Sequence, residues 1–462
     1  MSSERSTIVR HASTVLVGQL AVMAFGITDT IVAGRFADTA LAALAVGSAT
    51  YITVHITLMG MLQALLPVWA ELQGANRAAD VGPSVRQALY LCVLTMVIGM
   101  AALAYPQPLL NWTEVPLAMQ DEVKDYLWIV ALGLPASLLF RMFGTLNQSL
   151  GKPKLVTWVQ VIALMVKIPL SMVLTLGIEG LLPALGLVGC AWATLLVNYL
   201  MLALAIWLIR TQDFYQPYGL WQRLEAPDWQ VLQRFVRLGL PSGLTIGVEV
   251  TSFTLMSLFI ARLGVTATAS HQIVSNLAAV MYMVPLSLSI ATSARVSYWI
   301  GANNHRQARL ALRTGLSVVL LMCWVLASAL WLGREWVAAF YTRSPEVSLL
   351  TVALLGWITL YHLTDAVQVF CVFTLRSYNI TVLPLITYTV LLWGVGLAGG
   401  YAVAYGGMAV PFMPWLVAQS PIAFWQTSSF ALALTSTLLI AVLWRASKLR
   451  VHAQGIDMHR PT

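Results

Sequence analysis

The sequence predicts an all-α polytopic membrane protein with twelve transmembrane helices in two pseudo-symmetric six-helix bundles. Of its 462 residues, 59% are hydrophobic and only 10% are charged, and the mean hydropathy is +0.79. A soluble domain carries about 25% charged residues, so this chain could not cover a water-soluble surface. Long apolar runs recur along the whole chain, which indicates spanning helices, whereas a β-barrel would show short alternating strands.

Each predicted span is long enough for the roughly 20 residues that a helix needs to cross the hydrocarbon layer. The predicted spans are 12–34, 41–70, 87–106, 126–146, 155–177, 184–208, 236–261, 270–297, 309–333, 349–376, 381–405 and 424–446.

Two short matches indicate that the second half of the chain repeats the first. GANR at 74–77 corresponds to GANNHR at 301–306, an offset of 227 residues, and Ser149 corresponds to Ser377, an offset of 228. Six spans is an even number, so both halves would have the same orientation in the membrane, as in transporters that alternate access at the cleft between two halves.

The repeat predicts three regions. They are an N-terminal bundle at 1–208, a polar cytoplasmic linker at 209–235, and a C-terminal bundle with a cytoplasmic tail at 236–462. Nineteen of the 26 Lys and Arg residues fall on the side that carries both termini, so the positive-inside rule predicts cytoplasmic termini. The net charge of +8 reflects this bias over several loops and does not indicate a nucleic-acid partner.

Three carboxylates interrupt the predicted spans: Asp29, Glu249 and Asp365. A charge in hydrocarbon costs several kcal/mol even on lenient scales, so such groups usually serve ion or substrate movement; the alternative is a buried structural pair. Lys167 lies in the middle of its span, where it cannot easily reach an interface. We expect it to pair with Asp29, which is the span-interior acid of its own half.

Motifs for nucleotide hydrolysis and for common enzyme chemistry are missing. The sequence contains no G-x-x-x-x-G-K-[ST], H-E-x-x-H or G-x-S-x-G motif. We therefore expect no enzyme activity and no cofactor, and any pumping would have to use an ion gradient.

Several segments resemble the multidrug and toxic compound extrusion (MATE) transporters, in particular their NorM-like branch. The segments are GITDTIVAGRFADTALAALAVGS, ALLPVWAELQGANR, GLVGCAWAT, LGLPSGLTIGVEVTSFTL, HQIVSNLAAVMYMVPLSLSIATSARV and LTDAVQVFCVFTLRSYN, in this order over almost the whole chain. The resemblance implies two six-helix bundles facing a central cavity, in a bacterial inner membrane, and the export of organic, often cationic, drugs in exchange for Na+ or H+.

The resemblance also implies roles for individual residues. Glu249 matches the acidic residue of the seventh span, Asp365 and Tyr361 match the acid and tyrosine of the tenth, and Asp29 matches the acid of the first. All four are predicted to couple cation movement. The family often has N-I-P-L-N in the fifth span, where this chain reads K-I-P-L-S from Lys167, which puts a cation site built on those amides in doubt.

The predicted chemistry follows from oxygen ligands in a low-dielectric space. Glu249 and Asp365 would hold a proton, or a Na+ if the protein is sodium-coupled, and an organic cation would compete for the same negative field. Tyr361 lies one helical turn from Asp365 and shares its face. Residues expected to line an adaptable drug cavity are Met281, Tyr282, Phe259, Gln272 and Lys167.

We expect a monomer in a lipid bilayer with small organic cations as partners. The alternative function is a lipid-linked oligosaccharide or lipid flippase of the same architecture. A flippase cavity should be basic to receive pyrophosphate, whereas the span interiors here hold three acids.

Overall fold

The structure, a computed structural model, describes residues 2–107, 117–406 and 420–457. Within these ranges, twelve helices are long and apolar enough to cross a membrane, and the described chain contains no β-strand. The predicted fold class is therefore confirmed. The cytoplasmic tail expected at the end of the chain lies partly outside these ranges, because residues 458–462 are not described.

The first half of the chain is almost entirely helical in its described part. They are α1 (Ser2–Phe36), α2 (Asp38–Gln63), α3 (Leu66–Gly74), α4 (Ala78–Ala104), α6 (Leu117–Ser149), α7 (Pro153–Leu176), α8 (Leu187–Thr211) and the 3₁₀ helix η1 (Asp213–Tyr218).

The second half is also almost entirely helical in its described part. Its elements are α9 (Trp229–Ala261), α10 (Val265–Gly301), α11 (His305–Tyr341), α12 (Pro345–Arg376), α13 (Val382–Tyr388), the π-helix η2 (Thr389–Ala398), α14 (Gly399–Gly406) and α15 (Pro421–Asp457). Together α13, η2 and α14 form one continuous candidate span at Val382–Gly406.

The chain divides into two compact units. We call Thr14–Gly243 the N-terminal bundle, and Leu244–Thr462 with Met1–Ser13 the C-terminal bundle. Helices α1 and α9 each contribute to both bundles, so the first turns of α1 group with the second half of the chain. There Glu4 pairs with Arg295 of α10 and accepts a hydrogen bond of 2.9 Å from Trp299 Nε1.

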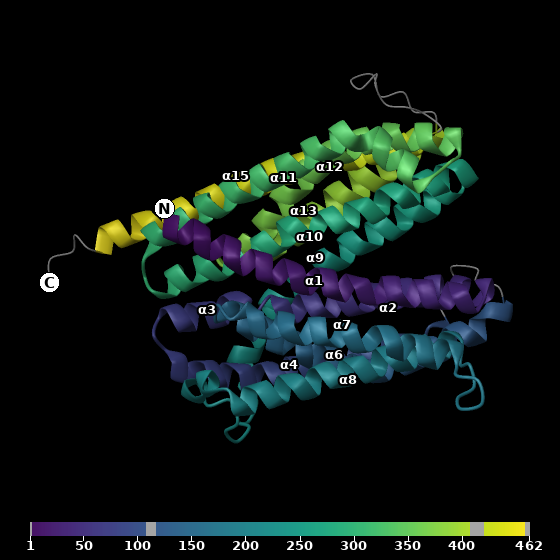
Figure 1. The fold of residues 1–462 in the computed structure, drawn as a ribbon. Coiled ribbons are helices and arrows are strands. Elements are labelled where there is room, and N and C mark those ends of the chain that lie inside the picture. The colour runs from purple at the N-terminus through teal and green to yellow at the C-terminus, as the bar shows by residue number, and fades with distance from the viewer. Residues whose placement is uncertain (1, 108–116, 407–419, 458–462) are drawn as a thin grey trace. The chain divides into compact units, whose positions relative to one another are not determined.

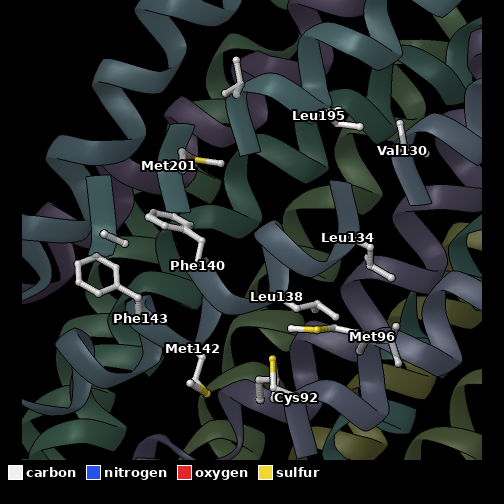
Figure 2. Close-up of a cluster of buried hydrophobic side chains, with 14 of the residues drawn as sticks. Cys92, Met96, Val130, Leu134, Leu138, Phe140, Met142, Phe143, Leu195 and Met201 are labelled. Carbon is white, nitrogen blue, oxygen red and sulfur yellow. The ribbon is translucent and has the colours of Figure 1, made fainter. Parts of the chain in front are cut away.

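Helix α6 is the central helix of the N-terminal bundle and packs against α2, α4 and α8. Its span is the most deeply buried of the twelve. Figure 2 shows part of the core on this helix, where Leu134 and Leu138 lie near Met96 of α4, and Phe140 lies near Met201 of α8. Close packing of apolar and sulfur-containing side chains holds this bundle together.

Helix α12 has the corresponding position in the C-terminal bundle, where it packs against α10, α11 and α15. The span formed by α13, η2 and α14 packs against α15, and its π-segment contains Gly394 and Gly396. The Gly396 carbonyl accepts a hydrogen bond of 2.8 Å from Thr427 Oγ1 of α15. A π-segment offers a side chain the backbone carbonyl groups that an α-helix would use internally.

The backbone repeats at the two landmarks that the sequence singles out. Asn76 (φ 57°) and Asn303 (φ 53°) both have left-handed conformations after α3 and α10, and Gly151 (φ 72°) and Asn379 (φ 60°) do so after α6 and α12. Glycine and asparagine tolerate this conformation best, which is why they end these helices. Each turn is closed by a backbone hydrogen bond from an N–H to the carbonyl five residues earlier: Arg77 to Leu72, Asn304 to Trp299, Lys152 to Asn147, and Ile380 to Leu375.

The segment between the two halves packs on the N-terminal bundle. Arg86 of α4 is buried and pairs with Glu225, and the Tyr215 hydroxyl donates a 2.7 Å hydrogen bond to Asn147 Oδ1 of α6. Burial raises the pKa of Tyr215 to about 12. A Cβ on Gly82 of α4 would lie 2.0 Å from the Tyr218 carbonyl oxygen, so the segment touches α4 closely.

Candidate cation-binding site

Two acidic side chains interact inside the C-terminal bundle. Asp365 of α12 is 4% exposed, whereas Glu249 of α9 is half-buried, and each lies within the electrostatic reach of the other. In the described part of the chain, neither makes a salt bridge, although Gln368 Nε2 donates a 3.1 Å hydrogen bond to Asp365 Oδ1. The two acids that the sequence interpretation assigns to one site thus lie in the same bundle.

Neighbouring elements hold Glu249 in place. Trp393 Nε1 of η2 donates a 3.1 Å hydrogen bond to the carbonyl of Val248, the residue before Glu249. The Tyr282 hydroxyl of α10 pairs with the Glu249 carboxyl. Helix α9 is therefore contacted at Glu249 by α10 and at the preceding residue by η2.

Tyr361 lies one turn before Asp365 and interacts electrostatically with both carboxylates. Its ring centroid lies 5.2 Å from that of Trp425 of α15 and 6.2 Å from that of Phe253 of α9, both with edge-to-face geometry. Trp425 is fully buried. These contacts orient the Tyr361 ring through aromatic packing rather than through a hydrogen bond.

The sequence interpretation did not include Arg376 among the site residues and placed it at the cytoplasmic end of the predicted span 349–376. The side chain is 2% exposed at the last turn of α12 and interacts electrostatically with Glu249. None of its three nitrogen atoms makes a hydrogen bond within the described chain, and its guanidinium lies 4.3 Å from the centroid of the Phe373 ring. The buried Tyr388 of α13 is a further neighbour.

The repeat marks the position of Arg376 in the sequence but not its burial. Arg376 directly precedes Ser377, the residue that matches Ser149. That both matched turns end helices at the centres of their bundles is known only from the structure.

The residues expected to line a drug cavity do not all gather near the carboxylates. Met281 is buried in the C-terminal core, and Tyr282 reaches Glu249. Phe259 instead packs edge-to-face on Tyr401 and stacks with Phe424, in an aromatic group towards the end of α9. Gln272 is exposed and donates a 3.3 Å hydrogen bond to Asn276 on its own helix.

One surface groove of about 630 Å³ lies on a different side of α12. Apolar residues of α11, α12 and α15 line it, among them Leu320, Trp324, Val367 and Ile440. Neither carboxylate is among its lining residues, so its apolar walls fit lipid chains better than a cation.

The N-terminal bundle contains the ion pair that the sequence predicts. Lys167 Nζ of α7 lies 2.7 Å from Asp29 Oδ1 of α1, and Lys167 is fully buried. Ser171 Oγ donates a 3.0 Å hydrogen bond to the same carboxylate oxygen. Lys167 and Ser171 are the two ends of the K-I-P-L-S segment, so both contact Asp29. Lys167 thus neutralises Asp29 and was correctly predicted to be its partner.

Oxygen-based sites suit hard monovalent cations better than transition metals. Among the described residues, no group of three His, Cys, Asp or Glu side chains is placed to hold a metal ion. Glu249, Asp365 and the nearby tyrosine hydroxyls offer oxygen atoms alone, which is the donor type that hard cations prefer.

The MatE family model matches residues 15–173 and 241–402, which is more than half of the chain. The chain belongs to the MatE family. This family consists of membrane transporters, so the protein is a multi-pass membrane transporter and not an enzyme.

Two curated relatives and one solved structure show the extent of the likeness. The chain is 37% identical to the "Probable multidrug resistance protein NorM" of Aromatoleum aromaticum over 93% of this chain and 92% of the relative. It is 33% identical to the "Multidrug resistance protein MdtK" of Yersinia pseudotuberculosis over 95% and 94%. A structure titled as the outward-facing conformation of a multidrug resistance MATE family transporter superposes with a TM-score of 0.83, at 15% identity, over 97% of each chain.

Proposed function

We propose that this protein is a secondary active multidrug exporter that exchanges organic, often cationic, compounds for Na+ or H+ by alternating access. The relatives named for multidrug resistance support the class of cargo. The observation that carries the coupling proposal is the interaction of Glu249 with Asp365 inside the membrane-spanning region of the C-terminal bundle.

Transport of the two cations is coupled because both compete for the negative field of Glu249 and Asp365. Two carboxylates without a salt bridge carry charge that a bound cation neutralises, and inside a low-dielectric region that neutralisation is worth far more than in water. A small inorganic cation and an organic cation then bind in turn, which is sufficient for exchange. Tyr361 and Tyr282 would add oxygen ligands or orient the carboxylates.

The site favours a positive cargo over the headgroup of a lipid-linked sugar. A flippase for pyrophosphate-bearing lipids needs basic side chains that can reach the anion. In the described chain, Lys167 is already neutralised by Asp29 and is fully buried, and Arg376 is buried beside Glu249. The acids that remain would repel a pyrophosphate.

We further propose the working arrangement in the cell. The two halves at 1–208 and 236–462 would move as bodies joined by the linker at 209–235. The protein would act as a monomer in the bacterial inner membrane with both termini in the cytoplasm, in agreement with the bias of Lys and Arg.

The test is ethidium transport by purified protein in liposomes, with a Na+ gradient or a pH gradient imposed alone. One of the two gradients should drive ethidium uptake, and Glu249→Gln and Asp365→Asn should each remove that dependence. Glu179→Gln serves as a matched control, because this exposed carboxyl lies outside the candidate spans and loses the same charge. Gradient-driven transport at the wild-type rate in both carboxylate variants would overturn the proposal.

A further inference from the structure

The ammonium group of Lys167 lies in a complete cage of oxygen atoms. Its three N–H groups face Asp29 Oδ1 at 2.7 Å, Thr194 Oγ1 at 2.7 Å and the carbonyl oxygen of Cys190 at 3.4 Å. These atoms come from α1 and α8, whereas the lysine comes from α7. Every hydrogen of the ammonium therefore has an acceptor, and Lys167 is fully buried.

The cage is also satisfied around the carboxylate. Asp29 Oδ1 accepts from Lys167 and from Ser171 Oγ, and Oδ2 lies 3.3 Å from Thr194 Oγ1. The Thr194 hydroxyl accepts the lysine and has its one hydrogen for either Asp29 Oδ2 or the Cys190 carbonyl, which lies 3.0 Å away. Because each of the three ammonium hydrogens has its own acceptor, the network holds the cation in a single position.

The atoms of the cage are those that would bind a free alkali cation. A carboxylate, a hydroxyl group and a backbone carbonyl are hard oxygen donors, and they surround the position of one positive charge. A lysine ammonium is a compact point charge on a flexible stem, so it can stand where a monovalent ion would stand.

We propose that Lys167 is a tethered cation that permanently fills a monovalent-cation site in the N-terminal bundle. The ammonium cannot leave, so Asp29 does not exchange an ion during transport, and exchange is confined to Glu249 and Asp365. This second statement rests on the proposed function, whereas the occupied cage does not.

The physical reason for the permanence is the cost of separating the pair. Removing one partner leaves the other charged in an apolar interior, which is strongly unfavourable. Replacing Lys167 by asparagine removes the tethered charge and adds an oxygen ligand, so the emptied cage should attract Na+ from solution. The residue at position 167 thus decides whether the chain's own ammonium fills the cation site or leaves it vacant.

The experiment measures Na+ binding in a protein whose other cation site has been removed. In the variant E249Q/D365N, Tm in detergent should be the same in NaCl as in N-methyl-D-glucamine chloride. Adding Lys167→Asn should make NaCl raise Tm by about 2 °C at saturating salt. Adding Asp29→Asn to that triple variant should abolish the rise.

Two outcomes would overturn the proposal. One is a Na+-dependent rise in E249Q/D365N that Asp29→Asn removes, because Asp29 would then bind an ion despite Lys167. The other is a folded K167N/E249Q/D365N protein whose Tm does not respond to Na+, because the cage would then not be a cation site.

If the triple variant does not fold, binding of ²²Na+ to K167N alone replaces it. One additional Na+ per chain relative to the wild type supports the proposal, and an unchanged stoichiometry contradicts it. A failure of the proposed function would appear elsewhere, as gradient-driven transport that persists in E249Q/D365N. The Na+ response of the cage does not depend on that result.

Discussion

The two bundles share a backbone repeat but have different charges at their centres. In the N-terminal bundle, Asp29 meets Lys167 at 2.7 Å and the two charges cancel. In the C-terminal bundle, Glu249 and Asp365 interact with one another, and the guanidinium of the nearby Arg376 makes no hydrogen bond within the described chain. The same fold therefore carries a neutralised centre in one half and a centre with two acids in the other. The two halves therefore differ in the charge at their centres rather than in the arrangement of their helices.

The matched turns show how far the symmetry extends. The left-handed residues Asn76 and Asn303, and likewise Gly151 and Asn379, end corresponding helices. Such caps depend only on local backbone conformation, so they survive while the buried side chains diverge. A repeat can thus keep the same backbone structure in both halves while the buried side chains differ in charge.

The largest expected effect is on transport through the C-terminal bundle. Glu249→Gln and Asp365→Asn should each lower ethidium efflux from cells by roughly tenfold or more, and the double variant should lose little beyond either single variant, because groups that act as one unit are not additive. Efflux is measured by fluorescence at matched membrane expression. If the fold loss of efflux in the double variant instead equals the product of the two single losses, the two acids do not share a site.

The next effect is on the stability of the N-terminal bundle. Lys167→Ala leaves Asp29 buried without its partner and should cost about 3–5 kcal/mol. The double variant D29N/K167M removes both charges at similar volume and should cost clearly less. Thermal unfolding in detergent compares the three proteins. Equal losses in both variants would show that packing, rather than charge, is what Lys167 supplies.

A smaller effect is expected where the interdomain segment touches the N-terminal bundle. Gly82→Ala places a Cβ 2.0 Å from the Tyr218 carbonyl oxygen and should cost about 1–3 kcal/mol through overpacking. Gly26→Ala is the matched control, because nothing lies within 4 Å of its added Cβ. Thermal unfolding and protease sensitivity at 212–228 report the result. If Gly82→Ala unfolds as late as Gly26→Ala, the segment is not held against α4.

The smallest effect concerns the pH dependence of that same contact. The hydrogen bond from Arg86 lowers the pKa of Glu225 below its ordinary 4.5. Its contribution to stability is therefore complete above pH 4.5 and is lost as the pH falls through the lowered pKa. Glu225 is exposed, so solvent screening keeps the contribution small.

Glu225→Gln tests this contribution. At neutral pH its Tm should be slightly below that of the wild type, and the difference should shrink as the pH falls below 4.5. A difference that grows towards acidic pH would mean that Glu225 and Arg86 do not stabilise the folded chain.

Much of the membrane architecture was predictable because it depends on sums over many residues. Twelve apolar runs indicated twelve spans, and the structure has twelve candidate spans in its described ranges. The pairing of Lys167 with Asp29 was also predictable. Lys167 lies in the middle of its span and Asp29 is the span-interior acid of the same half, so each is the counter-charge available to the other.

Other neighbours could not be read from the sequence. Whether Phe259 reaches the carboxylates depends on the rotation of α9, which instead places the ring against Tyr401 and Phe424. Arg376 is the last residue of a predicted span, where a long charged side chain can reach the interface, whereas helix packing buries it.

The sequence by itself determined the number of spans and the cancellation of charge in the N-terminal half. It also determined the half in which Asp29, Lys167, Glu249 and Asp365 each lie. Those properties follow from the cost of placing polar groups in an apolar medium, and that cost is nearly the same on every helix face. The tertiary structure alone decided that Arg376, Tyr282 and Tyr388 surround Glu249, because such contacts depend on how each helix is turned and packed against the next.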